Sequence, residues 1–109
     1  NQFHFIEVPL KMKPSYMVFP IILNPKFKNK RKQFINEIEK RGLQTRPIIS
    51  GSFVNQPATS LYKLNPKKIR FKDAEKIEKL GFVIGLHTTK ISNIDINFIK
   101  DCLFLIDKT

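Results

Sequence analysis

Apolar residues along the chain are spaced first as in a strand and then as in a helix. Residues 16–23 are rich in aromatic and β-branched side chains, which is typical of a strand. Pro20 lacks a backbone N–H, so we expect a sheet edge or a bulge at that point. Between residues 28 and 41 the apolar positions fall on one helical face. Gly42 follows two basic residues and predicts the left-handed stop of this helix.

The middle of the chain predicts a second strand, a loop and a second helix. Residues 43–49 favour a strand, in which Pro47 again indicates an edge or a strand end. Residues 50–66 are rich in Gly, Asn and Pro and predict a long loop, which is usually functional or disordered in a compact domain. Residues 72–80 predict a short helix that Gly81 stops.

The last third of the chain predicts a buried strand and a closing helix. Residues 82–86 form an apolar run, and Ser92 with Asp95 has the spacing of a capping box before a helical stripe at residues 99–106. The whole order predicts an α+β domain: a small antiparallel or mixed sheet with helices on one face. We assign this domain to residues 16–109 and treat residues 1–15, with an extended stretch at 3–8, as a linker.

Composition narrows the class of protein. The 109 residues include 41% hydrophobic residues and ten Phe, which suits one domain with a modest core. A single cysteine and no signal peptide favour the reducing cytoplasm, and the longest apolar stretch is too short to span a membrane. The chain begins with Asn1, so we expect it to be a piece of a longer protein. The net charge of +11 suits a polyanion partner, an acidic complement on an absent part of the protein, or biased codon usage.

Most catalytic and metal signatures are absent from the sequence. His4 and His87 are the only histidines and lack partners at metal-ligand spacing, and Cys102 lies on the apolar stripe of the last helix. The glycines do not have the spacing of a phosphate-binding loop. The basic run at residues 26–32 indicates a solvated face more than a phosphate site. We therefore expect no metal and no catalytic residue in this chain.

Polar chemistry concentrates at residues 42–58, where the chain leaves the predicted sheet. Arg46 offers a fixed charge and paired donors for a carboxylate or phosphate. Ser52, Asn55 and Gln56 add hydroxyl and amide groups that suit sugar hydroxyls or a base edge. This stretch predicts a site for an anionic or sugar-like ligand.

The run G-L-Q-T-R-P-I-I-S-G-S-F-V-N-Q-P-A at residues 42–58 resembles the C-terminal segment of the DegT/DnrJ/EryC1/StrS family of sugar aminotransferases. The similarity is greatest to its branch of nucleotide-sugar 3-dehydrases in lipopolysaccharide biosynthesis. Members have a T-R-P-like step followed by a G-N-(F/L)-x-x-Q-P-like loop. The likeness extends over residues 16–106, including a G-F-x-I-G-like strand near the end.

The resemblance implies the small C-terminal domain of a fold-type I enzyme that uses pyridoxal phosphate (PLP) or pyridoxamine phosphate (PMP). The missing N-terminal large domain would hold the cofactor, the parent would be a homodimer, and the substrate would be a nucleotide-linked keto-sugar. Substrate-binding positions carried over by motif are Arg46, Ser52, Asn55, Gln56 and His87. Ser52 replaces the family's usual Asn, and two threonines follow His87 in place of a proline-containing turn.

Two other classes of function stay open at this stage. The first alternative is a basic module that binds nucleic acid or another polyanion, which the charge favours and which no nucleic-acid motif supports. The second is a truncated domain that is inert or self-associates through the face its large domain would cover. The choice between aminotransferase and dehydrase depends on a Lys-or-His position outside these residues.

Overall fold

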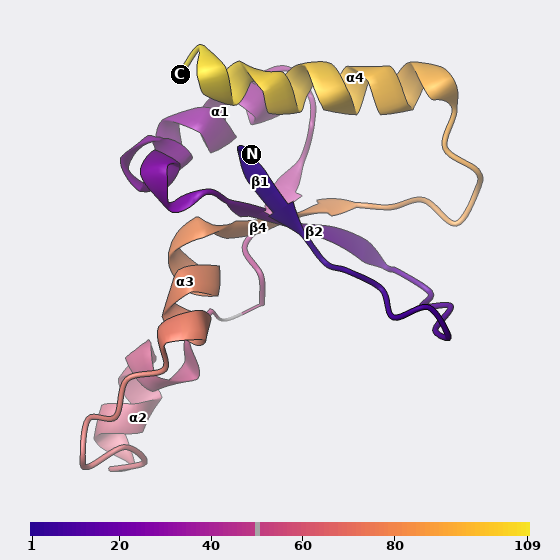
Figure 1. The fold of residues 1–109 in the computed structure, drawn as a ribbon. Coiled ribbons are helices and arrows are strands. Elements are labelled where there is room, and N and C mark those ends of the chain that lie inside the picture. Colours follow the sequence, from indigo (N-terminus) through magenta and orange to yellow (C-terminus); the bar gives the residue numbers. More distant parts are fainter. Residues whose placement is uncertain (50) are drawn as a thin grey trace.

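A computed structural model describes residues 1–49 and 51–109 of the chain as a four-stranded antiparallel sheet with four α-helices, an α+β domain (Figure 1). The strands pair in the order β1-β2-β4-β3. The elements, in chain order, are β1 (Phe3–Phe5), β2 (Val18–Leu23), the 3₁₀ turn η1 (Pro25–Lys30), α1 (Arg31–Lys40), β3 (Thr45–Arg46), η2 (Phe53–Asn55), α2 (Pro57–Leu61), α3 (Lys72–Leu80), β4 (Gly81–Gly85), α4 (Asn93–Phe104) and η3 (Leu105–Asp107).

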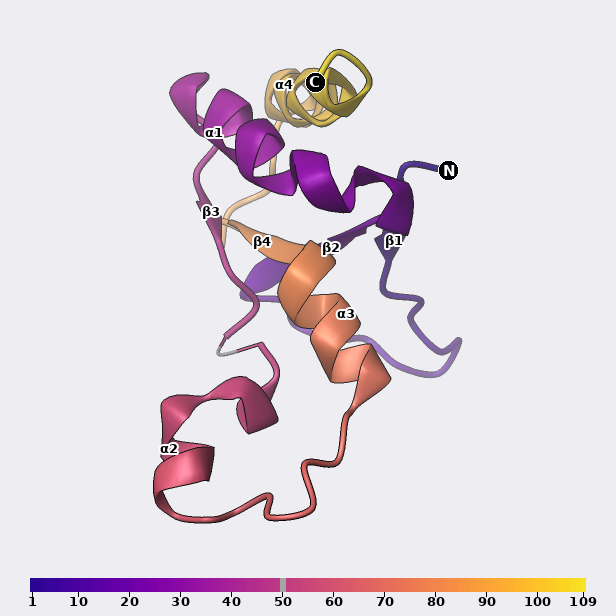
Figure 2. The same cartoon turned by 90° about the vertical axis from the view of Figure 1, so that its left-hand side faces the viewer.

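The core lies between one face of the sheet and the helices α1 and α4 (Figures 1 and 2). Alternate residues of β2 and β4 point to this face, and α1 contributes Phe34 and Ile38, both fully buried. The rings of Phe34 and Phe82 meet edge to face with centroids 6.0 Å apart. Cys102 and Ile106 complete the core from the C-terminal end, as their place on the predicted apolar stripe requires.

The prediction of helices on one face describes α1 and α4, whereas α3 and α2 extend away from the sheet on its other side (Figure 2). The radius of gyration is 16.1 Å, against about 13 Å for a compact chain of this size. The excess reflects this arm and the excursion of residues 6–17 between β1 and β2. The chain therefore exposes more surface than a self-contained domain of its length.

The predicted stops and caps are confirmed where they depend on local sequence. Gly42 has φ +101°, and the N–H of Leu43 bonds to the carbonyl of Ile38 over 3.1 Å, which is the Schellman pattern. Ser92 and Asp95 form the predicted capping box at the start of α4. Helix α3 also has the predicted bounds.

Pro20 and Gly81 are accommodated for reasons that the sequence pattern does not give. Strand β2 lies inside the sheet, but β1 pairs only with its residues 21–23, so Pro20 has a strand partner on one side alone. Gly81 has φ −84° and is no left-handed stop. It begins β4 directly, and a Cβ there would lie 2.5 Å from the carbonyl oxygen of Ile77. Close approach of α3 is what requires glycine at this position.

Two segment predictions are corrected. Part of the predicted linker, Phe3–Phe5, is a paired strand of the sheet, and Phe3 packs against the core. The predicted loop at residues 50–66 contains η2 and α2, since Pro57 fits the first turn of a helix and Thr59 Oγ1 donates to the carbonyl of Gln56 over 2.7 Å. Residue 50 lies outside the described residues. The strand predicted at 43–49 has only two paired residues, at the sheet edge that Pro47 indicated.

Candidate functional site

A cleft of about 430 Å³ lies at the β3 edge of the sheet. Arg46 is opposite Val83 in the register, so both are on the face that α1 and α4 leave uncovered. Thr45 is opposite Ile84 and is buried on the core side. The side chain of Arg46 therefore lies on the uncovered face of the sheet, and the buried side chain of Thr45 anchors β3 to the core. The lining is Val18, Gly42, Leu43, Gln44, Thr45, Arg46, Val83, Gly85, Leu86 and His87.

Arg46 and His87 come from distant parts of the chain and line this same cleft. Arg46 is exposed, and Nη1 donates to the carbonyl of Thr45 over 3.2 Å. Within the described residues no carboxylate forms an ion pair with Arg46. Its guanidinium therefore retains charge and donors for a ligand anion. His87 is also exposed, directly after the end of β4, and can donate or accept a hydrogen bond.

Ser52 does not join this cleft. It is fully buried, and its Oγ has no hydrogen-bond partner among the described residues. The family resemblance carries Ser52 over as a substrate-binding position, whereas the structure buries its side chain at the N-cap of η2, outside the lining of the Arg46–His87 cleft. A buried hydroxyl without a partner costs about 1–3 kcal/mol of desolvation.

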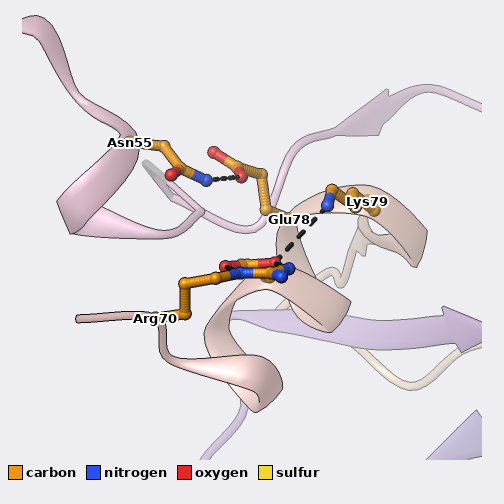
Figure 3. A network of polar contacts seen from close by, with 5 residues as sticks. Asn55, Arg70, Glu78 and Lys79 are labelled. Carbon is orange, nitrogen blue, oxygen red and sulfur yellow. Dashed lines mark hydrogen bonds and ion pairs between the residues drawn. The ribbon is translucent and has the colours of Figure 1, made fainter. Parts of the chain in front are cut away.

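Asn55 and Gln56 line two further hollows. Asn55 donates from Nδ2 to Oε2 of Glu78 over 2.6 Å, as Figure 3 shows, and borders a hollow of about 610 Å³ beside α2. Gln56 borders a hollow of about 310 Å³ with Pro47, Gly51 and Glu78. Neither hollow shares a lining residue with the Arg46–His87 cleft. Of the five predicted positions, Arg46 and His87 therefore share one cleft, Asn55 and Gln56 line two other hollows, and Ser52 is buried.

Glu78 positions the segment that carries these residues, and sequence reasoning missed it. Besides accepting from Asn55, Glu78 lies so close to Gly51 that a Cβ there would be 2.7 Å from its Cγ. Gly51 has φ +65°, and Ile49 has φ +43°, an unusual value for a β-branched residue. Gly51 therefore lies directly against α3, and Ile49 is a described residue near it that carries backbone strain. The sequence does not predict the contact between Glu78 and Gly51, because a glutamate on an amphipathic helix is expected to face solvent.

Ionisable groups around Glu75, which lies one turn before Glu78 on α3, form a second network (Figure 3). Arg70 donates from Nε to Oε1 of Glu75 over 2.9 Å and from Nη2 to Oε2, and Lys79 lies 3.5 Å from Oε2. The hydrogen bond from Arg70, opposed by burial, lowers the pKa of Glu75 from its ordinary value of 4.5 to about 2. The network fixes the segment before α3 to the helix.

Comparison with protein-family models, with curated proteins and with solved structures finds no match for this chain. Among the described residues, no group of His, Cys, Asp and Glu could hold a metal ion. In the same part of the chain no helix has both the length and the apolar character needed to cross a membrane. The fold and the cleft define a small α+β domain with a cationic site at a sheet edge.

Proposed function

We propose that this chain is the substrate-closing C-terminal domain of a PLP- or PMP-dependent enzyme that acts on a nucleotide-linked keto-sugar. The parent reaction is transamination or 3-deoxygenation in cytoplasmic synthesis of cell-surface polysaccharide such as lipopolysaccharide O-antigen. The observation that carries the proposal is that Arg46 and His87, which the family resemblance singles out in separate motifs, line one cleft.

The cleft provides binding chemistry that suits a sugar-linked anion. Besides the hydrogen bond from Nη1 to the carbonyl of Thr45, Arg46 offers N–H donors to a carboxylate or phosphate, and none of the ion pairs among the described residues neutralises its charge. His87 supplies a hydrogen bond to a sugar hydroxyl, and Gln44 adds an amide in the same lining. Asn55 and Gln56 border two separate hollows and would contact other parts of a large substrate.

The residues of this cleft do not fit the cofactor itself. Its lining contains no lysine, so the described chain offers no amine there for the cofactor aldehyde. The large domain of the proposed parent would hold the cofactor, which would supply the electron sink for chemistry next to the sugar carbonyl. The role of this chain is to bind and orient the substrate and to exclude water when it closes.

The shape of the chain supports a role as part of a larger protein. Large apolar side chains are exposed along the excursion between β1 and β2, where Leu10 and Met17 are almost fully accessible, and on the α2 arm, where Leu61 is 75% exposed. Exposed apolar surface of this kind is typical of a face that another domain or subunit covers. The large domain and the homodimer partner of the proposed parent would cover it.

The test uses the longest polypeptide that contains these residues, incubated with PLP. A visible absorption band, and a lysine adduct trapped by borohydride and found by mass spectrometry, would support the aminotransferase branch. Retention of the cofactor without a lysine adduct would support the dehydrase branch. Absence of any cofactor binding by that polypeptide would overturn the proposal.

Arg46→Ala tests the cleft in the same polypeptide. We expect kcat/KM to fall roughly 10- to 100-fold, because charge-assisted hydrogen bonds are worth about 1.5–3 kcal/mol. The urea midpoint should not change, since Arg46 is exposed. Arg41→Ala is the matched control, because Arg41 is also exposed and does not line the cleft. Equal activity of the Arg46 variant and the wild type would contradict this role.

A further inference from the structure

Two hollows along α3 share Arg70 and Glu75 in their linings. The larger, of about 610 Å³, borders α2, and the smaller, of about 310 Å³, borders η1 and α3. Helix α3, which runs from the sheet toward α2 (Figure 1), gives only Glu75 to the larger hollow and Lys72, Glu75, Lys76, Lys79 and Leu80 to the smaller one. We name their cationic lining the α3 basic surface: Lys28, Lys63, Lys68, Arg70, Lys72, Lys76 and Lys79.

The charge of this surface is largely unneutralised. Glu75 is the only acidic residue in either lining and is already bound by Arg70 and Lys79. The other five lysines of the α3 basic surface form no ion pair within the described residues. Concentrated unpaired charge is costly to hold together, and binding of anions relieves that repulsion.

The backbone holds two of these lysines in an unusual conformation. Lys63 and Lys68 each have φ +51°, and both line the larger hollow. The turn between them is fixed by Asn65, whose side chain donates to the carbonyl of Ile69 over 2.9 Å and accepts from its N–H over 3.0 Å. Left-handed conformation costs about 1–2 kcal/mol for each such residue. Strain of this kind is characteristic of binding sites.

The arrangement suits a chain of phosphates more than a single anion. Lys72, Lys76 and Lys79 are spaced i, i+4 and i+7 on one side of α3, which sets successive charges about 4–6 Å apart along the helix axis. The larger hollow adds apolar walls from Val54 and Ile69 next to its cations, as a nucleic-acid base requires.

The neighbouring aromatic residues favour unpaired bases. Tyr62 and Phe71 are 69% and 51% exposed and are adjacent in sequence to Lys63, Arg70 and Lys72. Exposed aromatic rings beside cations are the elements of single-strand binding, because bases stack on the rings while the cations follow the backbone.

We propose that the α3 basic surface binds single-stranded nucleic acid, with phosphates along α3 and a base in the larger hollow. This binding is independent of the proposed sugar chemistry, because none of the seven cations lines the Arg46–His87 cleft.

The experiment measures binding of a fluorescent twelve-nucleotide single-stranded RNA to the 109-residue chain by anisotropy between about 50 and 200 mM salt. The test variant is Lys68→Gln/Lys72→Gln/Lys76→Gln. The control, Lys11→Gln/Lys13→Gln/Lys90→Gln, removes the same charge from exposed lysines outside both hollows. Circular dichroism verifies that both variants fold.

We expect affinity to fall linearly with salt on logarithmic axes. The slope of the test variant should be smaller by about 2, since each phosphate contact on a single strand contributes about 0.7. The control should keep the wild-type slope. Equal loss in both variants would overturn the proposal, because the binding would then reflect net charge alone. Absence of RNA binding at about 50 mM salt, or binding of inorganic polyphosphate without RNA, would also overturn it.

Discussion

Substitution of Gly51 by alanine tests whether Glu78 of α3 lies directly against Gly51. Gly51 has φ +65°, and an added Cβ would lie 2.7 Å from Cγ and 2.9 Å from Cβ of Glu78. Gly42 is the matched control, because it also has positive φ, +101°, but its Cβ would meet no atom within 4 Å. The two substitutions share the left-handed strain and differ in the contact with α3.

The expected magnitudes follow from this difference. Gly42→Ala should lower the free energy of unfolding by about 1–2 kcal/mol through strain alone. Gly51→Ala should lower it by at least about 1 kcal/mol more, the low end of overpacking costs, because rotation of the half-buried Glu78 can move its Cγ away but not its Cβ, which lies 2.9 Å from the added methyl. The rotation would also break the bond between Asn55 and Glu78.

Urea unfolding of the 109-residue chain, followed by far-ultraviolet circular dichroism, measures these differences. Glu78→Ala removes the Cγ that the new methyl would meet, so the double variant Gly51→Ala/Glu78→Ala should lose less stability than the sum of the single changes. If Gly51→Ala costs no more than Gly42→Ala, or if the double variant is additive, Glu78 does not press on the turn and the reasoning is refuted.

Three other properties of the chain can be checked in the same unfolding assay. The lowered pKa of Glu75 stabilises the folded chain fully above the unfolded pKa near 4.5, and this stability is lost as pH falls toward about 2. Glu75→Gln should therefore reduce the difference in the free energy of unfolding between pH 5 and pH 2. Ser92→Ala should cost about 1 kcal/mol at pH 7 by removing the cap of α4, and an unchanged urea midpoint would contradict the capping box. Burial raises the pKa of the Cys102 thiol, so a thiol reagent should modify Cys102 slowly until urea unfolds the chain, and fast labelling of the native chain would show that this thiol is accessible.

Only part of the candidate site could be predicted from the sequence. Arg46 and His87 line one cleft because β3 pairs with β4, which brings the middle of the strand predicted at residues 43–49 beside the residue that follows the apolar run at 82–86. Ser52 differs, since its burial depends on how η2 folds under α3. Glu78 gave no signal, because its role depends on Gly51 and Asn55, which the sequence does not place near α3.

The sequence by itself determined the elements whose causes lie within a few residues. The apolar stripe of α1, the left-handed stop at Gly42, the capping box at Ser92 and the buried run of β4 all follow from local spacing and local hydrogen bonds. The hydrogen bonds of the Gly42 stop and of the Ser92 cap connect residues three to five positions apart, so both can be predicted from a short stretch of sequence.

Only the tertiary structure decided how these elements combine. The strand order places β2 inside the sheet, and the short β1 leaves Pro20 unpaired on one side. Gly81 is required by contact with Ile77 rather than by its own φ. The separation of the predicted ligand residues, and the joining of lysines from η1, α3 and the α2 arm into one basic surface, depend on packing between distant segments. Packing of this kind is a property of the folded chain, because no local period encodes which surfaces meet.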